Sequence, residues 1–158
     1  MVKKMTTKIM GGTSLMDITL PSNMLYKASN AELIQEDFSF LVAYATEASK
    51  VTDPIERISI LTAGFVGGLT TMSRVLNGAP PIPMRIGETY ESVFEDGSRL
   101  YIEQAGHKRT DTLVLIYGPN ESFRISCHYN IKLKMKGISP NTMSGHKNKP
   151  IYIFFADG

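Results

Sequence analysis

The residues best suited to binding an anion form one short cluster after an apolar run. His107, Lys108 and Arg109 follow Gly106 directly. Three such side chains beside a glycine can hold a phosphate through charge-assisted hydrogen bonds. The alternative is a polar turn at the end of a strand, and the residues alone leave both interpretations open.

A second set of cations recurs on alternate positions of one long segment. Such a face is most often the solvated outer surface of a sheet, but it can also attract an anionic membrane or a phosphorylated head group. The residues of this face are Arg124, His128, Lys132, Lys134 and Lys136.

Neither a metal site nor covalent catalysis is indicated. The three histidines and Cys127 lack the spacing of metal ligands, and the adjacent Cys127 and His128 point to opposite faces of a strand. No nucleophile motif surrounds a serine or the cysteine. We therefore expect no enzymatic activity and no metal.

Length and charge narrow the class of protein further. The chain has 158 residues, 17 Lys+Arg and 15 Asp+Glu, which fits one domain and shows no nucleic-acid footprint. A single cysteine gives no support for an oxidising compartment. The longest uncharged stretch, 58–73, is shorter than the roughly 20 residues of a spanning helix. We expect a cytoplasmic protein, peripheral at membranes at most, with an organellar assembly left open.

Two helices are predicted within 31–78. The first has Asn30 as its N-cap and an apolar face at steps of three and four residues. The second begins at Asp53-Pro54, with proline in the first turn, and ends at Asn77-Gly78. The apolar positions are Ile34, Phe38, Leu41, Ala45 and Ala48 in the first helix, and Ile55, Ile58, Leu61, Phe65, Leu69, Met72 and Val75 in the second.

Three glycines in the second helix predict a close contact. Gly64, Gly67 and Gly68 each weaken a helix by about 1 kcal/mol relative to alanine. That cost suggests that another element approaches closely on the face that they share.

A proline-rich linker over 79–87 separates the helices from antiparallel strands over 88–158. Strands are predicted at 89–94 and 99–104, joined by a hairpin turn at Asp96-Gly97. A third strand is predicted at 112–117, a loop at 141–149 and a last strand at 150–155.

The clearest strand is 122–136, where apolar and polar residues alternate without a slip. A strand of this length belongs to a large curved sheet or barrel, or is broken by a bulge. Its apolar face carries Phe123, Ile125, Cys127, Tyr129, Ile131, Leu133 and Met135.

Five segments, in the same order, make the chain resemble the lipid-binding domain of the oxysterol-binding protein-related family. GTSLMDITLP is similar to that family's GKDLSKITLP, DPIER to DPLER, GETYE to the end of NPLLGETYE, EQAGH to EQVSHHPP, and SCHY to SGHY. In this chain they lie at 12–21, 53–57, 87–91, 103–107 and 126–129.

The resemblance implies a non-enzymatic lipid carrier: an antiparallel β-barrel around an apolar tunnel for one sterol or phospholipid. It places a lid-like N-terminal segment, the lid-like lead, at 1–30. It also places a phosphate-binding site at the mouth of the tunnel, near Glu88, His107, Lys108 and Arg109. Phe123, Ile125, Tyr129, Ile131 and Leu133 are then the face toward the apolar ligand, or toward a partner. No cofactor beyond such a lipid is implied.

The chain departs from the family pattern at the mouth. Pro80 and Pro83 stand where the family has a lysine and an asparagine, and His107-Lys108 replaces its histidine pair. The family's domain is also more than twice as long.

We therefore expect an α+β fold: a single truncated domain over 1–158, with two helices packed on an incomplete, barrel-like sheet. The unpaired sheet edge must be covered, by collapse of the chain or by a protein partner or larger assembly. Two functions follow: lipid binding or transfer at a membrane, or a degenerate fold serving as a structural subunit of a complex.

Overall fold

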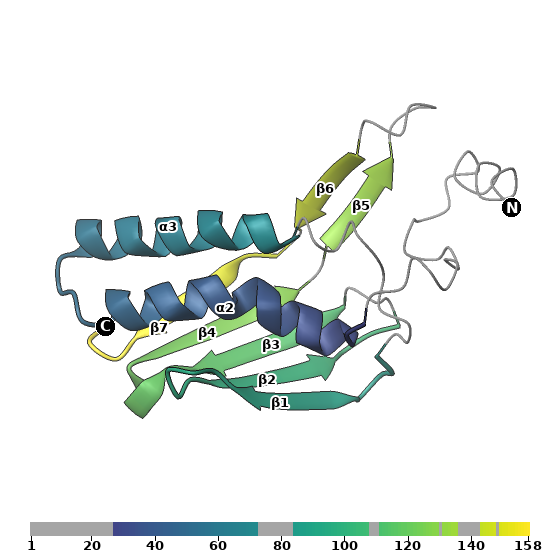
Figure 1. Cartoon of the computed structure of the whole chain (residues 1–158), viewed down its shortest axis with the longest axis horizontal. Coiled ribbons are helices and arrows are strands. Elements are labelled where there is room, and N and C mark those ends of the chain that lie inside the picture. The colour runs from purple at the N-terminus through teal and green to yellow at the C-terminus, as the bar shows by residue number, and fades with distance from the viewer. Residues whose placement is uncertain (1–26, 73–83, 108–110, 130, 136–142, 148) are drawn as a thin grey trace, which may run out of the picture.

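The computed structural model describes residues 27–72, 84–107, 111–129, 131–135, 143–147 and 149–158. Within them, two helices lie on one side of an open five-stranded antiparallel sheet, and a two-stranded hairpin forms a second sheet. Figure 1 shows the α+β arrangement, which confirms the predicted fold class. The predicted lid-like lead lies outside the described residues except at 27–30.

Helix α2 (Asn30–Ala48) covers the sheet with the apolar face that the sequence predicts. Its N-cap, however, is Ser29 and not Asn30. The Ser29 hydroxyl accepts a hydrogen bond from the Glu32 backbone N–H, and the Glu32 carboxylate accepts one from the Ser29 N–H. This reciprocal capping box places Asn30 inside the first turn.

Helix α3 (Pro54–Met72) starts where the sequence predicts. The Asp53 carboxylate accepts a hydrogen bond from the backbone N–H of Glu56, 3.2 Å away, so Asp53 caps the helix and Pro54 occupies its first position. The predicted continuation to Gly78 falls in 73–83, outside the described residues.

The main sheet has the strand order β1-β2-β3-β4-β7, with every neighbouring pair antiparallel. A turn at 94–98 joins its first two strands, with Gly97 at φ +87°. The predicted positions of β1, β2, β3 and β7, and the predicted start of β4, are confirmed to within a residue. The strands are β1 (Thr89–Val93), β2 (Arg99–Gln104), β3 (Thr112–Tyr117), β4 (Phe123–Tyr129) and β7 (Ile151–Phe155).

The long predicted strand is divided in two. Strand β4 ends at Tyr129 in the main sheet, and β5 (Ile131–Met135) pairs instead with β6 (Met143–Lys147). The prediction of a loop across 141–149 was therefore wrong. The β6 sequence lacks apolar alternation, and its strand conformation comes from backbone pairing with β5, which composition does not reveal.

Helix α3 presents its glycines, not its apolar stripe, to α2. A Cβ added to Gly64 would lie 2.6 Å from Cβ of Tyr44, and one added to Gly68 would lie 3.3 Å from the Asp37 carbonyl oxygen. The close contact predicted from the three glycines is confirmed. Because the glycine side faces α2, the predicted apolar side of α3 points elsewhere.

Candidate functional site

Of the five residues proposed to face an apolar ligand or a partner, the three on β4 lie in or against the core. Phe123 and Ile125 are 1% and 0% exposed and pack with residues of α2, while Tyr129 is partly buried beside Phe38. Ile131 and Leu133 lie on β5, in the second sheet. The helix-facing side of the main sheet is thus filled by α2.

Two polar contacts hold α2 on this side of the sheet. The Tyr129 hydroxyl donates a hydrogen bond to the Asp37 carboxylate, and the Tyr90 hydroxyl donates one to Oε1 of Gln35 over 2.7 Å. Burial raises the pKa of Tyr129 well above its usual value, and the neighbouring Asp37 charge raises it further. The phenol therefore remains a neutral donor at physiological pH.

The head-group candidates that the structure describes lie at one end of the sheet. Backbone hydrogen bonds join Gln104 to both Gly87 and Glu88, which brings Glu88 to the end of β2 where His107 follows. The Glu88 carboxylate accepts a hydrogen bond from the backbone N–H of Arg85, 2.8 Å away. Glu88 and His107 are both exposed. Lys108 and Arg109 lie outside the described residues.

A buried network shapes the turn that carries His107. The Gln104 amide donates to the Gly106 carbonyl over 2.7 Å, and the Thr112 hydroxyl donates to the Gln104 side-chain oxygen over 2.9 Å. The Ala105 N–H donates to the Asp111 carbonyl. Asp111 also pairs with His128 on β4. His107 therefore directly follows a segment, 104–106, that is held by hydrogen bonds.

The largest uncovered apolar surface on the helices is a stripe along α3. Ile58 is 62% exposed and Val66 is 56% exposed. No charged residue occurs between 58 and 69, so the stripe carries none of the charge that a solvent-facing helix surface normally has. We call it the α3 stripe; its members are Ile55, Ile58, Phe65, Val66 and Leu69.

Four members of the α3 stripe (Ile55, Ile58, Phe65 and Leu69) belong to the apolar face that periodicity predicts for this helix, and the structure leaves them exposed. The amphipathic spacing correctly locates an apolar face but not the direction in which it points. The absence of charge on every side of the helix was the available signal, because a helix that is apolar all round requires a cover on more than one side.

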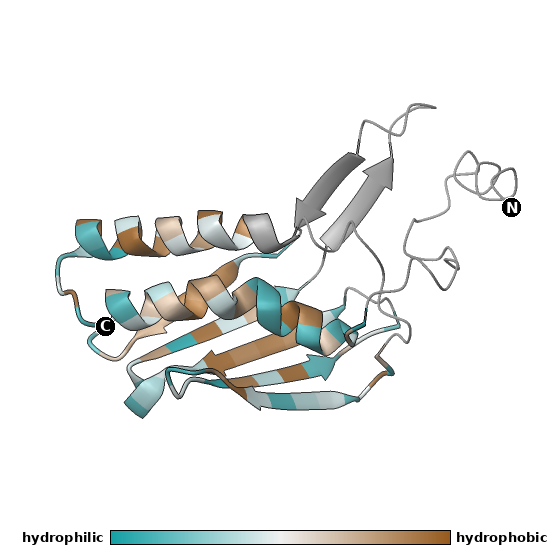
Figure 2. Ribbon diagram, viewed as in Figure 1, coloured by the Kyte–Doolittle hydropathy of each residue, from teal (hydrophilic) through white to brown (hydrophobic). Residues whose placement is uncertain are grey.

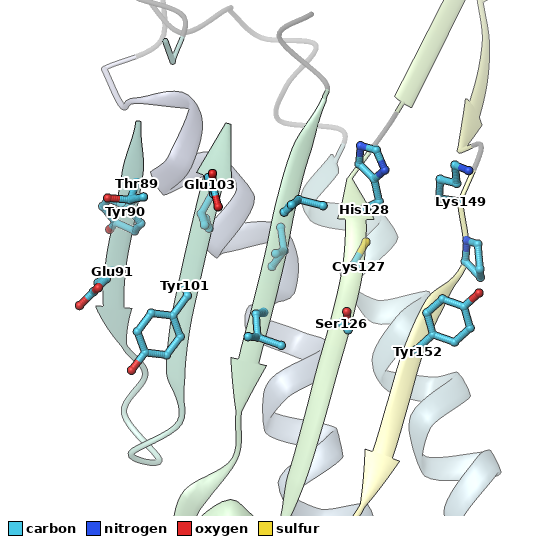
Figure 3. A pocket seen from close by; sticks show the side chains of 15 residues that line it. Thr89, Tyr90, Glu91, Tyr101, Glu103, Ser126, Cys127, His128, Lys149 and Tyr152 are labelled. Atoms are coloured by element: carbon cyan, nitrogen blue, oxygen red, sulfur yellow. The ribbon is translucent and has the colours of Figure 1, made fainter. Parts of the chain in front are cut away.

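A second surface lies on the opposite side of the sheet. It contains a groove of about 590 Å³ that is lined by side chains of all five strands. Figure 3 shows how these side chains lie. Glu91 and Glu103 stand toward one side of it, and His128 and Lys149 toward the other. The basic side chains on β4 were predictable from the sequence, but this groove was not.

Among the described residues, no three His, Cys, Asp or Glu side chains gather closely enough to share a metal ion. No helix in the described part of the chain combines the length and apolarity needed to cross a bilayer.

Comparison with known proteins identifies a distant relative. The chain is 27% identical over all 158 residues to oxysterol-binding protein 9 of Dictyostelium discoideum, and it spans 36% of that protein. The chain thus covers about a third of the length of the curated relative that it matches. No family model matches the chain. The resemblance seen in the sequence is confirmed as distant homology.

Proposed function

We propose that the chain is part of a non-enzymatic lipid-binding module in which an apolar ligand, a sterol or an acyl chain, lies against the α3 stripe. The observation that carries this proposal is the exposed, uncharged surface from Ile58 to Leu69. Its distant relative is named for binding oxysterols, which supports the same class of ligand.

The energetics favour an apolar occupant. Burying an exposed leucine, isoleucine or phenylalanine side chain contributes about 1.5–3 kcal/mol, and the stripe offers several of them along one helix. The neighbouring Phe40 and Tyr44 of α2 are 41% and 39% exposed. They contact Gly67 and Gly64 at the seam between the helices, so α2 also presents exposed aromatic surface beside α3.

The polar head group of such a lipid is proposed to bind at the end of the sheet that carries His107. Its imidazole, with the adjacent Lys108 and Arg109, supplies donors for a phosphate. Glu88 lies at the same end through its link to Gln104. This arrangement would orient the module on a membrane surface.

A second candidate function is that of a structural subunit. It is favoured by the packing of α2 over Phe123 and Ile125, which leaves no room for a ligand on that side of the sheet. In this case the α3 stripe and the sheet edges would be covered by a protein partner instead of a lipid.

Native mass spectrometry separates the two functions. The chain is equilibrated with vesicles containing phosphatidylcholine and a sterol, re-isolated and measured beside a lipid-extracted sample. Lipid binding predicts one bound lipid per chain and its loss in the double variant Ile58→Glu/Phe65→Glu. Leu115→Glu, on the far side of the sheet, is the matched control and should keep the lipid. If the chain carries no lipid either after equilibration with the vesicles or after lipid extraction, lipid binding is rejected and the structural role is favoured.

The head-group assignment has its own test. Lys108→Glu and Arg109→Glu should each weaken co-sedimentation with phosphoinositide-containing vesicles by at least about fivefold, because charge-assisted contacts are lost. Lys50→Glu, at an exposed position just after the end of α2, controls for net charge. Unchanged binding in both variants would contradict a phosphate site at this turn.

A further inference from the structure

The side of the main sheet that faces away from α2 is unusually apolar for a surface in water. Antiparallel sheets with one solvated face normally place polar residues there. Here Leu113, Tyr152 and Phe154 are 44%, 56% and 47% exposed. Clusters of this kind mark interaction sites.

The strand register arranges these residues in transverse rows. One row runs across the sheet with Leu115 of the central strand β3 in the middle, and the next row has Tyr117 in the middle. The two rows are Glu91, Tyr101, Leu115, Ser126 and Tyr152, and Val93, Arg99, Tyr117, Arg124 and Phe154. The rings of Tyr101 and Tyr117 meet edge to face, 6.2 Å apart, which links the rows.

Charges surround this apolar strip in a defined pattern. Glu91 and Glu103 lie on the flank formed by β1 and β2. Arg99 and Arg124 stand on either side of Tyr117. None of these four forms an ion pair with another described residue. Arg124 instead stacks over the Phe154 ring, with its guanidinium carbon 4.8 Å from the ring centre.

The presence of both acidic and basic side chains on this face distinguishes between the classes of partner that could bind it. An anionic bilayer and a nucleic-acid backbone would both be repelled by Glu91 and Glu103. Exposed tyrosine and arginine side chains are instead the residues enriched in protein interfaces. Glu103 and His128 lie two strand spacings apart, roughly 10 Å, which is the width of an α-helix with its side chains, about 10–12 Å.

We propose that this outer sheet face binds an amphipathic helix of a partner protein, laid along β3. Its apolar stripe covers Leu113, Leu115 and Tyr117, and basic side chains on one flank face Glu91 and Glu103. The three outward residues of β3 span roughly 13 Å, which matches about nine helical residues. The C-terminal end of the partner helix lies over Arg99 and Arg124, where its negative dipole end and acidic side chains are favoured.

Selection from a displayed library of helical peptides tests the proposal without a known partner. Peptides are selected on the full 158-residue chain and counter-selected on its Leu115→Lys variant. The expected result is enrichment of peptides with an apolar stripe, lysine or arginine along one flank and aspartate or glutamate in the last turn. The best peptide is then synthesised for affinity measurements.

Charge reversal tests the orientation. The double variant Glu91→Lys/Glu103→Lys should bind the selected peptide at least tenfold more weakly, and a peptide with its flanking lysines changed to glutamate should recover that loss. Glu47→Lys on α2, on the opposite side of the sheet, is the control for charge reversal and should bind normally. Circular dichroism and thermal unfolding verify that each variant folds.

Three results would overturn the proposal. The first is a selection in which no peptide is enriched on the wild-type chain relative to the Leu115→Lys variant. The second is enrichment without the charge pattern. The third is Leu115-dependent binding of phosphatidylserine vesicles or of a single-stranded oligonucleotide, which would assign the face to another class of partner.

Discussion

At the scale of single residues, polar side chains join the elements at defined points. The Asp96 carboxylate accepts hydrogen bonds from the hydroxyl of Thr46 at the end of α2 and from the backbone N–H and hydroxyl of Ser98. Burial by itself would raise the pKa of Asp96, but these hydrogen bonds outweigh it and lower the pKa. One carboxylate thus ties the β1–β2 turn to a helix.

Replacing this carboxylate should make stability less sensitive to acid. The lowered pKa means that ionised Asp96 stabilises the fold above the unfolded-state value of about 3.9, and that this contribution is lost as the pH falls through the folded-state pKa. Asp96→Asn should lower the free energy of unfolding at pH 7 by about 1 kcal/mol, a low figure because the site is exposed. Urea unfolding at pH 7 and pH 3 measures the difference, which should shrink at pH 3.

The matched control for this prediction is Glu95→Gln. Glu95 is the exposed neighbour in the same turn, and its removal changes the net charge equally. A difference between wild type and Asp96→Asn that is the same at both pH values would show that ionisation of Asp96 is not the cause.

At the scale of elements, the contact between α2 and α3 depends on the positions of the glycines in α3. Gly64 lies directly against the side chain of Tyr44, whereas Gly67 leaves 3.4 Å between an added Cβ and Cδ1 of Phe40. The two glycines share a helix and a helix face, yet only one of them is sterically required.

These glycines therefore predict opposite outcomes for the same substitution. Gly64→Ala should destabilise the chain by about 1–3 kcal/mol, because overpacking exceeds the gain in helix propensity. Gly67→Ala should be neutral or stabilising by up to about 1 kcal/mol. Chemical denaturation of both variants measures the difference. Equal effects would contradict the close approach of α3 to α2 at Gly64.

At the scale of the whole molecule, the described part of the chain leaves two more surfaces unpartnered besides the outer face of the sheet. One is the α3 stripe, which Figure 2 shows as apolar bands on the helix. The other is the pair of outer strands in the main sheet, β1 and β7. Arg57 at the start of α3 pairs with Asp157 and stacks 4.4 Å from the Phe155 ring, so α3 is anchored beside β7 while its stripe remains open.

Charging the stripe should change association much more than folding. Ile58→Glu/Phe65→Glu should alter the free energy of unfolding by less than about 0.5 kcal/mol per site, as expected for exposed positions. It should also reduce binding of an apolar fluorescent dye and concentration-dependent self-association. A loss of several kcal/mol would instead show that α3 packs through this stripe within the chain.

Much of the architecture could be predicted from local patterns. The two-residue alternation identified β4, and the Asp96-Gly97 turn located β1 and β2 around it. The order of five short motifs indicated the distant relationship that the comparison confirmed. The capping residue of α2 was missed by one position, because Ser29 and Asn30 are both good caps and only the partner Glu32 distinguishes them.

The sequence by itself determined most of the segments that become helix or strand, because hydrophobic periodicity and turn chemistry act over a few neighbouring residues; β6, which lacks apolar alternation, is the exception. Only the tertiary structure decided that α2 is the element that packs on the glycine side of α3, and that the strand beginning at Phe123 changes partner after Tyr129. Both outcomes depend on how closely distant backbones can approach and on which strand supplies hydrogen bonds. The apolar stripe of α3 is therefore left open because Gly64 and Gly68 admit α2 more closely than larger side chains could.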